Sequence, residues 1–157
     1  MLLPILQDDE PILRKRAVRV TEFNTPFLHD LVNNMFETMR HANGIGLADP
    51  QVGVGLALFI FGGVENIPAT VLINPKVEAI GNELVQMGEG CLSLPGCVAS
   101  ITRPAKVYYS GWDPMHRFIE GEATGLHARV ILHENDHLKG ILLLDRIEDE
   151  KDIAKGL

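Results

Sequence analysis

Two histidines one helical turn apart, His133 and His137, enclose Glu134 in the pattern His-Glu-x-x-His. On an α-helix, residues four positions apart lie on one face, so both imidazoles could reach a single metal ion. Glu134 would then stand beside that ion as a candidate general base. The alternative is a pair of ordinary helix histidines with a solvated glutamate, because a five-residue pattern also arises by chance. A third ligand would favour the metal site.

A catalytic metal ion normally takes three protein ligands and leaves one position for water. Downstream of His137, Leu143 stands where an extended His-x-x-Gly-x-x-His pattern would carry its third histidine. Glu148 and Glu150 follow closely and are predicted to belong to a solvated tail. The third ligand is therefore expected upstream, where Cys91 is the best candidate.

Three segments that occur in this order resemble the signature motifs of the peptide deformylases. They are residues 44–51 (GIGLADPQ), residues 89–95 (EGCLSLP) and residues 133–138 (HENDHL). Residues 11–14 (PILR) and Arg103 also match positions that are typical of the family. The resemblance covers most of the chain, and three motifs together are far more specific than the histidine pattern alone.

The resemblance implies a hydrolase that removes the formyl group from the N-terminal formylmethionine of nascent polypeptides and releases formate. Cys91, His133 and His137 would hold one divalent metal ion. The family implies iron(II) in the cell, while zinc, nickel or cobalt also suits these ligands. The metal would bring the pKa of bound water to about 7. Glu134 would carry the proton from water to the departing amide nitrogen.

The resemblance also assigns roles to residues outside the ligand set. The side-chain amide of Gln51 and the backbone N–H of Leu92 would stabilise the negative charge on the former formyl oxygen. An extended peptide would bind beside residues 45–46, with an apolar pocket for the methionine side chain. Asp136 could orient a histidine ring, or be a solvated helix charge. The expected substrate-binding residues are Ile45, Gly46, Met87, Leu126 and Val130.

Two positions depart from the family pattern. Asp49 stands where the first motif generally has alanine, and its charge could repel hydroxide or merely face solvent. Leu132 replaces the glutamine that commonly precedes the first histidine, which removes a hydrogen-bonding amide. Neither change removes a ligand, the base or the oxyanion donor. Activity is therefore expected, with a reduced rate or a shifted substrate preference as open outcomes.

Hydrophobic periodicity and turn residues predict an α+β fold. One helix is expected from about residue 26 to 41, capped by Thr25, and a second from about 124 to 138, with Gly140 just beyond it. Antiparallel or mixed sheets would pack around this second, metal-binding helix in a single domain over residues 1–157. The expected strands are residues 56–61, 70–73, 76–80, 98–102, 106–110 and 117–122.

The formal net charge of −7 and the pI near 5.3 argue against bare nucleic acid or an anionic membrane as the main partner. The apolar start lacks a preceding basic region, which predicts no signal peptide, and no apolar run approaches the roughly 20 residues that cross a bilayer. A working thiolate at Cys91 favours the cytoplasm, or an organelle if a presequence is absent, and Cys97 is predicted to pack. The family resemblance implies N-formylmethionyl peptides of nascent chains as partners, and it leaves proximity to the ribosome open.

Two other functions stay open at this point. The first is a related metallo-amidase or peptidase that uses the same activated water on a shifted substrate. The second is a catalytically impaired deformylase-like domain that binds peptides and uses the metal for stability. Three ligands with an adjacent glutamate favour an open, reactive site, since a structural zinc usually has four protein ligands.

Overall fold

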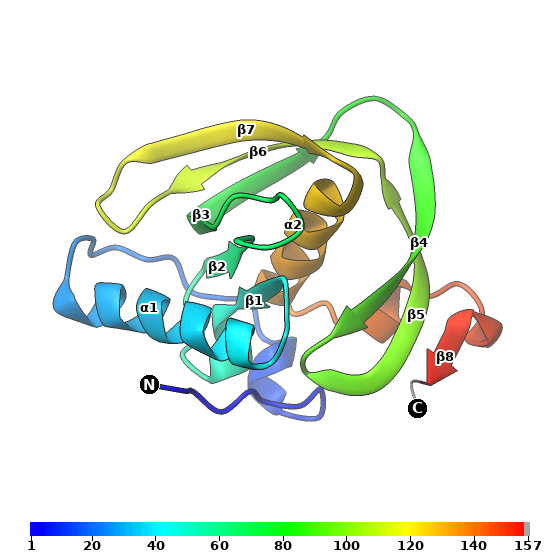
Figure 1. Cartoon of the computed structure of the whole chain (residues 1–157), viewed down its shortest axis with the longest axis horizontal. Helices are drawn as coiled ribbons and strands as arrows, with labels where there is room; N and C mark the ends of the chain where they lie inside the picture. Colours follow the sequence, from blue (N-terminus) through cyan, green and yellow to red (C-terminus); the bar gives the residue numbers. More distant parts are fainter. Residues whose placement is uncertain (156–157) are drawn as a thin grey trace.

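The computed structural model describes residues 1–155. Helix α1 spans Pro26–His41 and lies at the lower left in Figure 1. Thr25 caps the helix, because its hydroxyl oxygen accepts a hydrogen bond from the Leu28 N–H at 3.1 Å. Pro26 occupies the first turn, where no N–H is needed. The helix ends just before Asn43, whose φ of 58° turns the chain away. The prediction for residues 26–41 is confirmed.

The strands of the described residues form two antiparallel sheets. The larger sheet has the order β1-β2-β3-β6-β7, with β1 (Gly46–Ala48), β2 (Leu58–Phe61), β3 (Thr70–Ala79), β6 (Lys106–Trp112) and β7 (Phe118–Thr124). The smaller sheet has the order β4-β5-β8, with β4 (Leu84–Cys91), β5 (Leu94–Pro104) and β8 (Ile153–Lys155). Short 3-10 helices are η1 (Pro11–Arg14), η2 (Asp49–Val52), η3 (Leu143–Arg146) and η4 (Glu150–Asp152).

Helix α2, Gly125–Leu138, lies between the larger sheet and the β4–β5 pair (Figure 1). Strand β2 is buried on both faces because its side chains alternate between the two helices. Phe59 and Phe61 pack in the cluster that contains the apolar side chains of α2, whereas Leu58 and Ile60 pack in the cluster of α1. This layered core fixes α2 rigidly at the centre. None of the helices among residues 1–155 is long and apolar enough to span a membrane.

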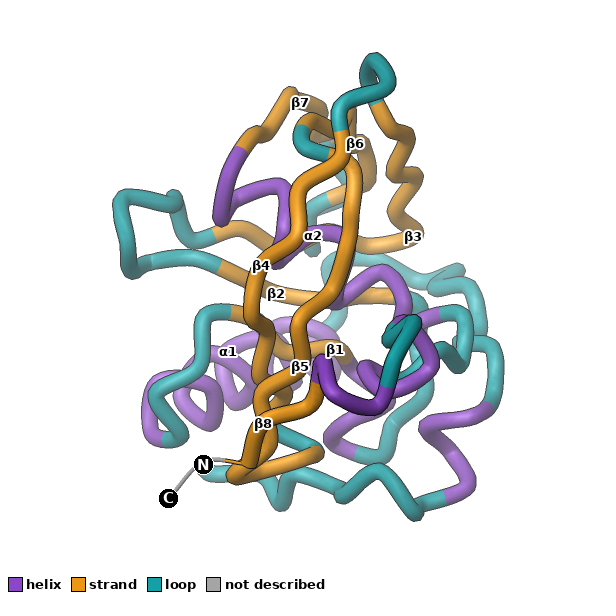
Figure 2. Tube along the Cα trace, turned by 90° about the vertical axis from the view of Figure 1, so that its right-hand side faces the viewer, coloured by secondary structure: helices purple, strands orange, loops and turns teal. Residues whose placement is uncertain are grey.

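Strands β4 and β5 form a long twisted ribbon that runs beside α2 (Figure 2). Ala99 and Ile101 of β5 pack with Leu143 of η3 in a small apolar cluster. Strand β4 is an edge of its sheet, and β1 is an edge of the other sheet. Cys91 is the last residue of β4, so the ribbon delivers this thiol to the central helix.

The α+β prediction and both long helices are confirmed, but the strand predictions need correction. Residues 70–73 and 76–80 were expected as separate strands, yet they belong to the single strand β3, whose register shifts between Ile73 and Lys76. Strands β1, β4 and β8 were not predicted. The solvated tail was also wrong in part, because Glu148 is exposed but residues 153–155 pair with β5. Residues 156–157 lie outside the described residues.

Candidate metal centre

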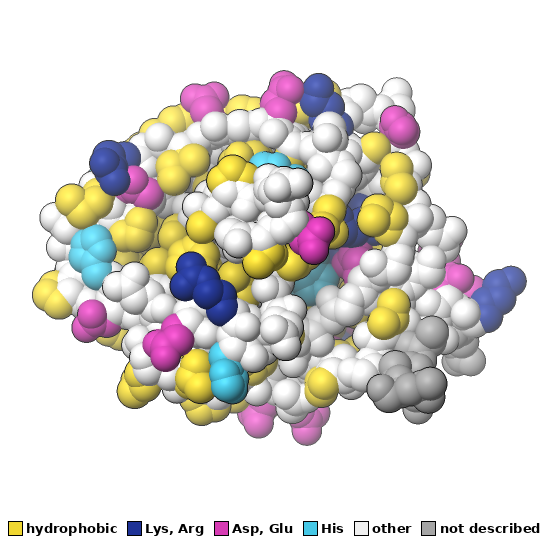
Figure 3. Space-filling model, in the orientation of Figure 1, with side chains coloured by type: hydrophobic (Ala, Val, Ile, Leu, Met, Phe, Trp, Pro, Cys, Tyr) yellow, Lys and Arg dark blue, Asp and Glu magenta, His cyan; other side chains and the backbone are white. Residues whose placement is uncertain are grey.

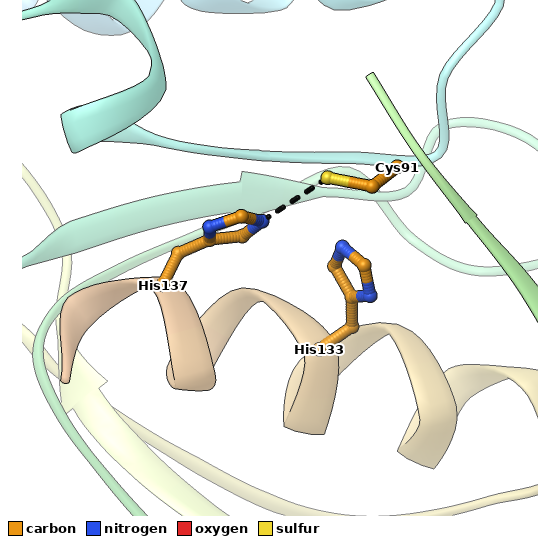
Figure 4. Close-up of side chains that lie close together, drawn as sticks. All are labelled: Cys91, His133 and His137. Atoms are coloured by element: carbon orange, nitrogen blue, oxygen red, sulfur yellow. Dashed lines mark hydrogen bonds between the residues drawn. The ribbon is translucent and has the colours of Figure 1, made fainter. Parts of the chain in front are cut away.

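Cys91, His133 and His137 come together where the ribbon meets α2, and one ligand atom from each lies within 4.8 Å of the others. The Sγ of Cys91 lies 3.4 Å from the Nε2 of His137 (Figure 4). The two imidazole rings stand one turn apart on the helix, with centroids 5.1 Å apart. His133 and His137 are buried and Cys91 is half-buried. The donor set expected from the sequence therefore shares one site.

The protonation of the two histidines is set by different surroundings. Burial lowers the pKa of His137 to about 3, so its ring is neutral and offers a lone pair. Burial also disfavours charge on His133, but the carboxylates of Glu134 and Glu89 and the Cys91 sulfur outweigh it and raise its pKa. The Nδ1 of His133 lies 2.9 Å from Glu89 Oε1, which leaves Nε2 to face the other ligands.

Glu89 is the centre of a buried charge network beside His133. Arg103 donates to both of its oxygens, from Nε at 2.6 Å and Nη2 at 2.9 Å, and Arg129 donates from Nη1 at 2.8 Å. Burial alone would raise the pKa of Glu89. The hydrogen bonds from His133, Arg103 and Arg129 outweigh this effect and lower the pKa to about 2. The carboxylate is thus kept ionised and holds the His133 ring.

Asp136 contacts arginines rather than a histidine in this structure. Its carboxylate accepts from Arg103 Nη1 at 2.9 Å and from Arg146 Nη2 at 2.7 Å. Neither oxygen has a hydrogen bond to a ring nitrogen among the described residues. Asp136 is buried, so it is not a solvated helix charge either. Its contribution to the site is indirect, through Arg103.

Glu134 is buried beside the candidate ligands, with Oε2 4.0 Å from His133 Nε2. Burial raises its pKa to about 7, although the neighbouring His133 partly lowers it. Its Oε1 has no hydrogen-bond partner among the described residues. Opposite Glu134, a Cβ on Gly46 would stand 2.6 Å from Oε2, so only glycine fits there without displacement. A carboxyl group whose pKa lies close to neutral pH is suited to proton transfer.

Gln51 reaches the site from η2 with its amide orientation fixed. Its Oε1 accepts from the Ala48 N–H at 2.9 Å, and its Nε2 donates to Ser93 Oγ at 3.0 Å. The same Nε2 lies 3.7 Å from Cys91 Sγ. The N–H₂ end of the amide therefore points toward the sulfur. Leu92 follows Cys91 in the turn. Its side chain packs closely against Gly44, because a Cβ added at Gly44 would stand 2.7 Å from Leu92 Cδ1.

A cavity of about 760 Å³ opens in front of these residues. In Figure 3 this face is hollowed between the body of the molecule and the β4–β5 ribbon, with histidine and acidic side chains within and hydrophobic ones around them. The cavity is lined by four of the five expected substrate-binding residues, Ile45, Gly46, Leu126 and Val130, together with the candidate ligands Cys91 and His133 and with Gln51, Leu92 and Glu134. His137 is not among the residues that line it.

Met87 is the expected pocket residue that the structure does not place in this cavity. It lines a separate hollow of about 320 Å³ beside the start of α2. Met87 precedes Glu89 by two residues on β4, which moves its side chain about 7 Å along the strand and away from the site. Sequence reasoning also missed Arg129, although its position one turn before His133 on the same helix face was a usable signal.

The two departures from the family motifs are both accommodated inside the protein. Asp49 is fully buried rather than solvent-facing, and its Oδ2 accepts from the Leu56 N–H at 2.8 Å. Its Oδ1 has no partner among the described residues, and burial raises the pKa of this carboxyl to about 7. Leu132 packs against the core cluster of α2. An apolar contact thus replaces the amide expected before His133.

Comparison with known proteins agrees with this geometry. A family model described as polypeptide deformylase matches residues 2–152. Peptide deformylase 1 of Bordetella pertussis is 45% identical over 157 residues, covering 95% of this chain and 89% of the relative. Peptide deformylase 1 of Nitrosomonas europaea is 42% identical with the same coverage.

Solved structures give the same result. The crystal structure of peptide deformylase from Thermotoga maritima matches with a TM-score of 0.90 and 38% identity, covering 95% of this chain and 99% of that one. The enzyme from Synechococcus elongatus, in complex with actinonin, matches with a TM-score of 0.89 and 40% identity, covering 96% and 81%. The sequence matches and the fold match agree, and this chain belongs to the metal-dependent peptide deformylase family.

Proposed function

We propose that this protein removes the formyl group from N-terminal formylmethionine of nascent polypeptides and releases formate. The observation that carries the proposal is the convergence of three metal-binding side chains and a buried carboxyl group at one cavity, in a chain of the deformylase family. A peptide-binding domain that used its metal only for stability would need neither a fourth open coordination position nor Glu134 beside it.

The residues present fit a divalent metal ion. Cys91 Sγ, His133 Nε2 and His137 Nε2 would hold it, and three protein ligands leave one position for water. One thiolate and two imidazoles suit iron(II), zinc, nickel and cobalt, and we propose iron(II) in the cell. When bound, such an ion lowers the pKa of its water to about 7.

Glu134 is proposed as the group that moves the proton. It takes a proton from the water as the water oxygen bonds to the formyl carbon, and it delivers that proton to the amide nitrogen as the carbon–nitrogen bond breaks. The products are formate and a free amino terminus, so atoms and charge balance. A carboxyl group whose pKa lies near 7 can both accept and return a proton at neutral pH.

Gln51 and Leu92 are proposed to stabilise the charge that develops on the formyl oxygen. Because Ala48 holds Oε1, the N–H₂ of Gln51 is the end that is presented near Cys91. The backbone N–H of Leu92 comes directly after that ligand and would supply a second donor. Donors that are fixed before reaction stabilise the transition state without reorganisation cost.

The substrate is proposed to bind as an extended chain. Gly46 begins β1 and β4 ends at Cys91, and both strands are sheet edges that flank the cavity, so a peptide could add to them through backbone hydrogen bonds. Ile45, Leu126 and Val130 would surround the methionine side chain. We infer that the protein binds nascent chains in the cytoplasm near the ribosome, or in an organelle if a presequence is absent.

Formate release from formyl-methionyl peptides by anaerobically prepared, iron-loaded protein is the direct test. Unformylated and N-acetylated peptides serve as matched controls. We expect formate from the formylated peptide and no cleavage of the other two. Cleavage of the acetyl group or of a peptide bond would instead indicate a metallo-amidase or peptidase. Binding of metal and peptide without any formate would indicate a binding domain.

A further inference from the structure

The two kinds of candidate ligand come from elements that are not continuous in sequence or sheet. Cys91 ends β4 of the ribbon, whereas His133 and His137 lie on α2 (Figure 4). Without a metal ion, the position of the thiol relative to the imidazoles depends on how the ribbon is fastened to the helix. The fastening is largely polar along this face, because Glu89, Arg103 and Arg129 are buried between them.

Arg129 reaches from α2 to both strands of the ribbon. Its Nη2 donates to the Val85 carbonyl of β4 at 2.7 Å, and its Nη1 donates to the Ile101 carbonyl of β5 at 2.7 Å. The same Nη1 lies 2.8 Å from Glu89 Oε2. The side chain of Arg129 is only 5% exposed, so these contacts form in a shielded environment where charge-assisted hydrogen bonds are strong.

Arg129 is also connected to His133. The two residues are one turn apart on α2, and Glu89 bridges them by accepting from Arg129 at Oε2 and pairing with His133 Nδ1 at Oε1. Arg103 makes the reverse connection, from β5 to Asp136 on the helix. Arg129 contacts β4 at two residues, Val85 and Glu89, whereas Arg103 contacts β4 through Glu89.

We propose that Arg129 is a positioning residue that clamps the ribbon to α2 and so sets Cys91 at ligand distance from the two histidines before any metal binds. The proposal rests on the proposed function only in taking these three residues as the metal site. Loss of the clamp would leave the carbonyls of Val85 and Ile101 without this donor and would release the end of β4. The cost would appear in metal affinity and in the accessibility of the Cys91 sulfur.

The test compares Arg129→Met and Arg129→Lys with the parent protein, all in a Cys97→Ser background so that Cys91 is the single reporting thiol. Cobalt(II) affinity is measured by chelator competition, and the cobalt–thiolate absorption band is recorded. The metal-free proteins are alkylated with iodoacetamide. Leu28→Ala, a buried change in α1 away from the ribbon, is the control for lowered stability.

We expect Arg129→Met to weaken cobalt affinity about 10-fold to 100-fold, to reduce the thiolate band and to raise the Cys91 alkylation rate several-fold. Arg129→Lys, which keeps a charged donor, should fall between it and the parent. Leu28→Ala should lower the melting temperature and leave all three readouts near the parent values. Parent-like affinity and alkylation in folded Arg129→Met would overturn the proposal. If that variant does not fold, a parent-like Arg129→Lys has the same meaning.

Failure of the proposed function would look different. Parent protein that shows the cobalt–thiolate band but releases no formate contradicts the deformylase activity and leaves the clamp intact. Parent protein without the band contradicts the ligand set, and the alkylation rates of the metal-free proteins then decide the role of Arg129 on their own.

Discussion

Gly46 and Glu134 are in such close apposition that a methyl group on Gly46 would stand 2.6 Å from the Glu134 carboxylate oxygen Oε2 and 2.7 Å from a methyl carbon of Val130. Strand β1, which borders the cavity, therefore packs directly against Glu134, the proposed base. Gly46→Ala should push Glu134 aside and lower kcat about 100-fold, since misplacement by about 1 Å has this scale of effect. Metal content should stay near that of the wild type.

Removing the carboxyl group itself should have a larger effect. Glu134→Ala is expected to lower kcat by about 10²-fold to 10⁴-fold, the usual contribution of a positioned acid–base group. Glu134→Gln, which keeps the shape, should be equally impaired because it cannot take up the proton. Fixed-time formate assays, with metal analysis of the same samples, check the activity of both variants. Near-normal turnover of either variant would contradict the assignment of Glu134.

How much of this site could be predicted from the sequence depends on the range of the signal. The ligands and the base are readable because their spacing on one helix is a local property, and the motif around Cys91 supplies the third donor. The contacts of Arg129 and Asp136 are not readable in the same way, because their partners lie on β4, β5 and η3. Such partners are known only once the fold is assembled.

The same contrast explains the fold. The helices carry a 3.6-residue apolar repeat and clear punctuation, so they were found nearly to the residue. Strand β4 escaped prediction because its sequence, LVQMGEGC, contains two glycines and is mostly exposed or half-buried. Strand β8 has three residues and exists by pairing with β5. Asp49 was expected to face solvent or repel hydroxide because charge normally excludes a residue from the core.

The buried Asp49 should make stability depend on pH. Its pKa is raised from 3.8 to about 7 in the folded protein, so between these values the folded state keeps a proton that the unfolded state has lost. The contribution of Asp49 is therefore favourable below pH 4 and is lost as the pH rises to about 7, by roughly 4 kcal/mol at most. Relative to Asp49→Asn, the wild-type free energy of unfolding should decline across this range and stay level above it.

Urea unfolding of both proteins at several pH values between 4 and 8 measures this difference. The Asn variant retains an oxygen acceptor for the Leu56 N–H, so the comparison isolates the titrating proton rather than the hydrogen bond. Other groups titrate in both proteins and cancel in the subtraction. A difference that does not change with pH would show that Asp49 is ionised in the folded state throughout.

Metal identity should determine sensitivity to air. Cys91 is only half-buried, so a ferrous ion that it holds and its own thiolate are both accessible to oxidants. Iron-loaded protein is therefore expected to lose activity during handling in air. Nickel-loaded or cobalt-loaded protein should retain more. Formate assays before and after aeration, with intact mass to detect oxygen added at Cys91, provide the comparison. Equal loss for all three metals would remove the support for a labile iron site.

Gln51 and Leu92 should respond differently to truncation because one acts through its side chain and the other through its backbone. Gln51→Ala removes an amide that is fixed by Ala48 and presented near Cys91, and it should lower kcat about 10²-fold to 10³-fold, as loss of one oxyanion donor does. Leu92→Ala keeps the N–H and loses packing against Gly44 and the apolar cluster of α1, so it should retain most of kcat and lose some stability. Measuring kcat and melting temperature for both separates the two roles. A Leu92→Ala variant as inactive as Gln51→Ala, at unchanged stability, would mean that the leucine side chain itself positions the substrate.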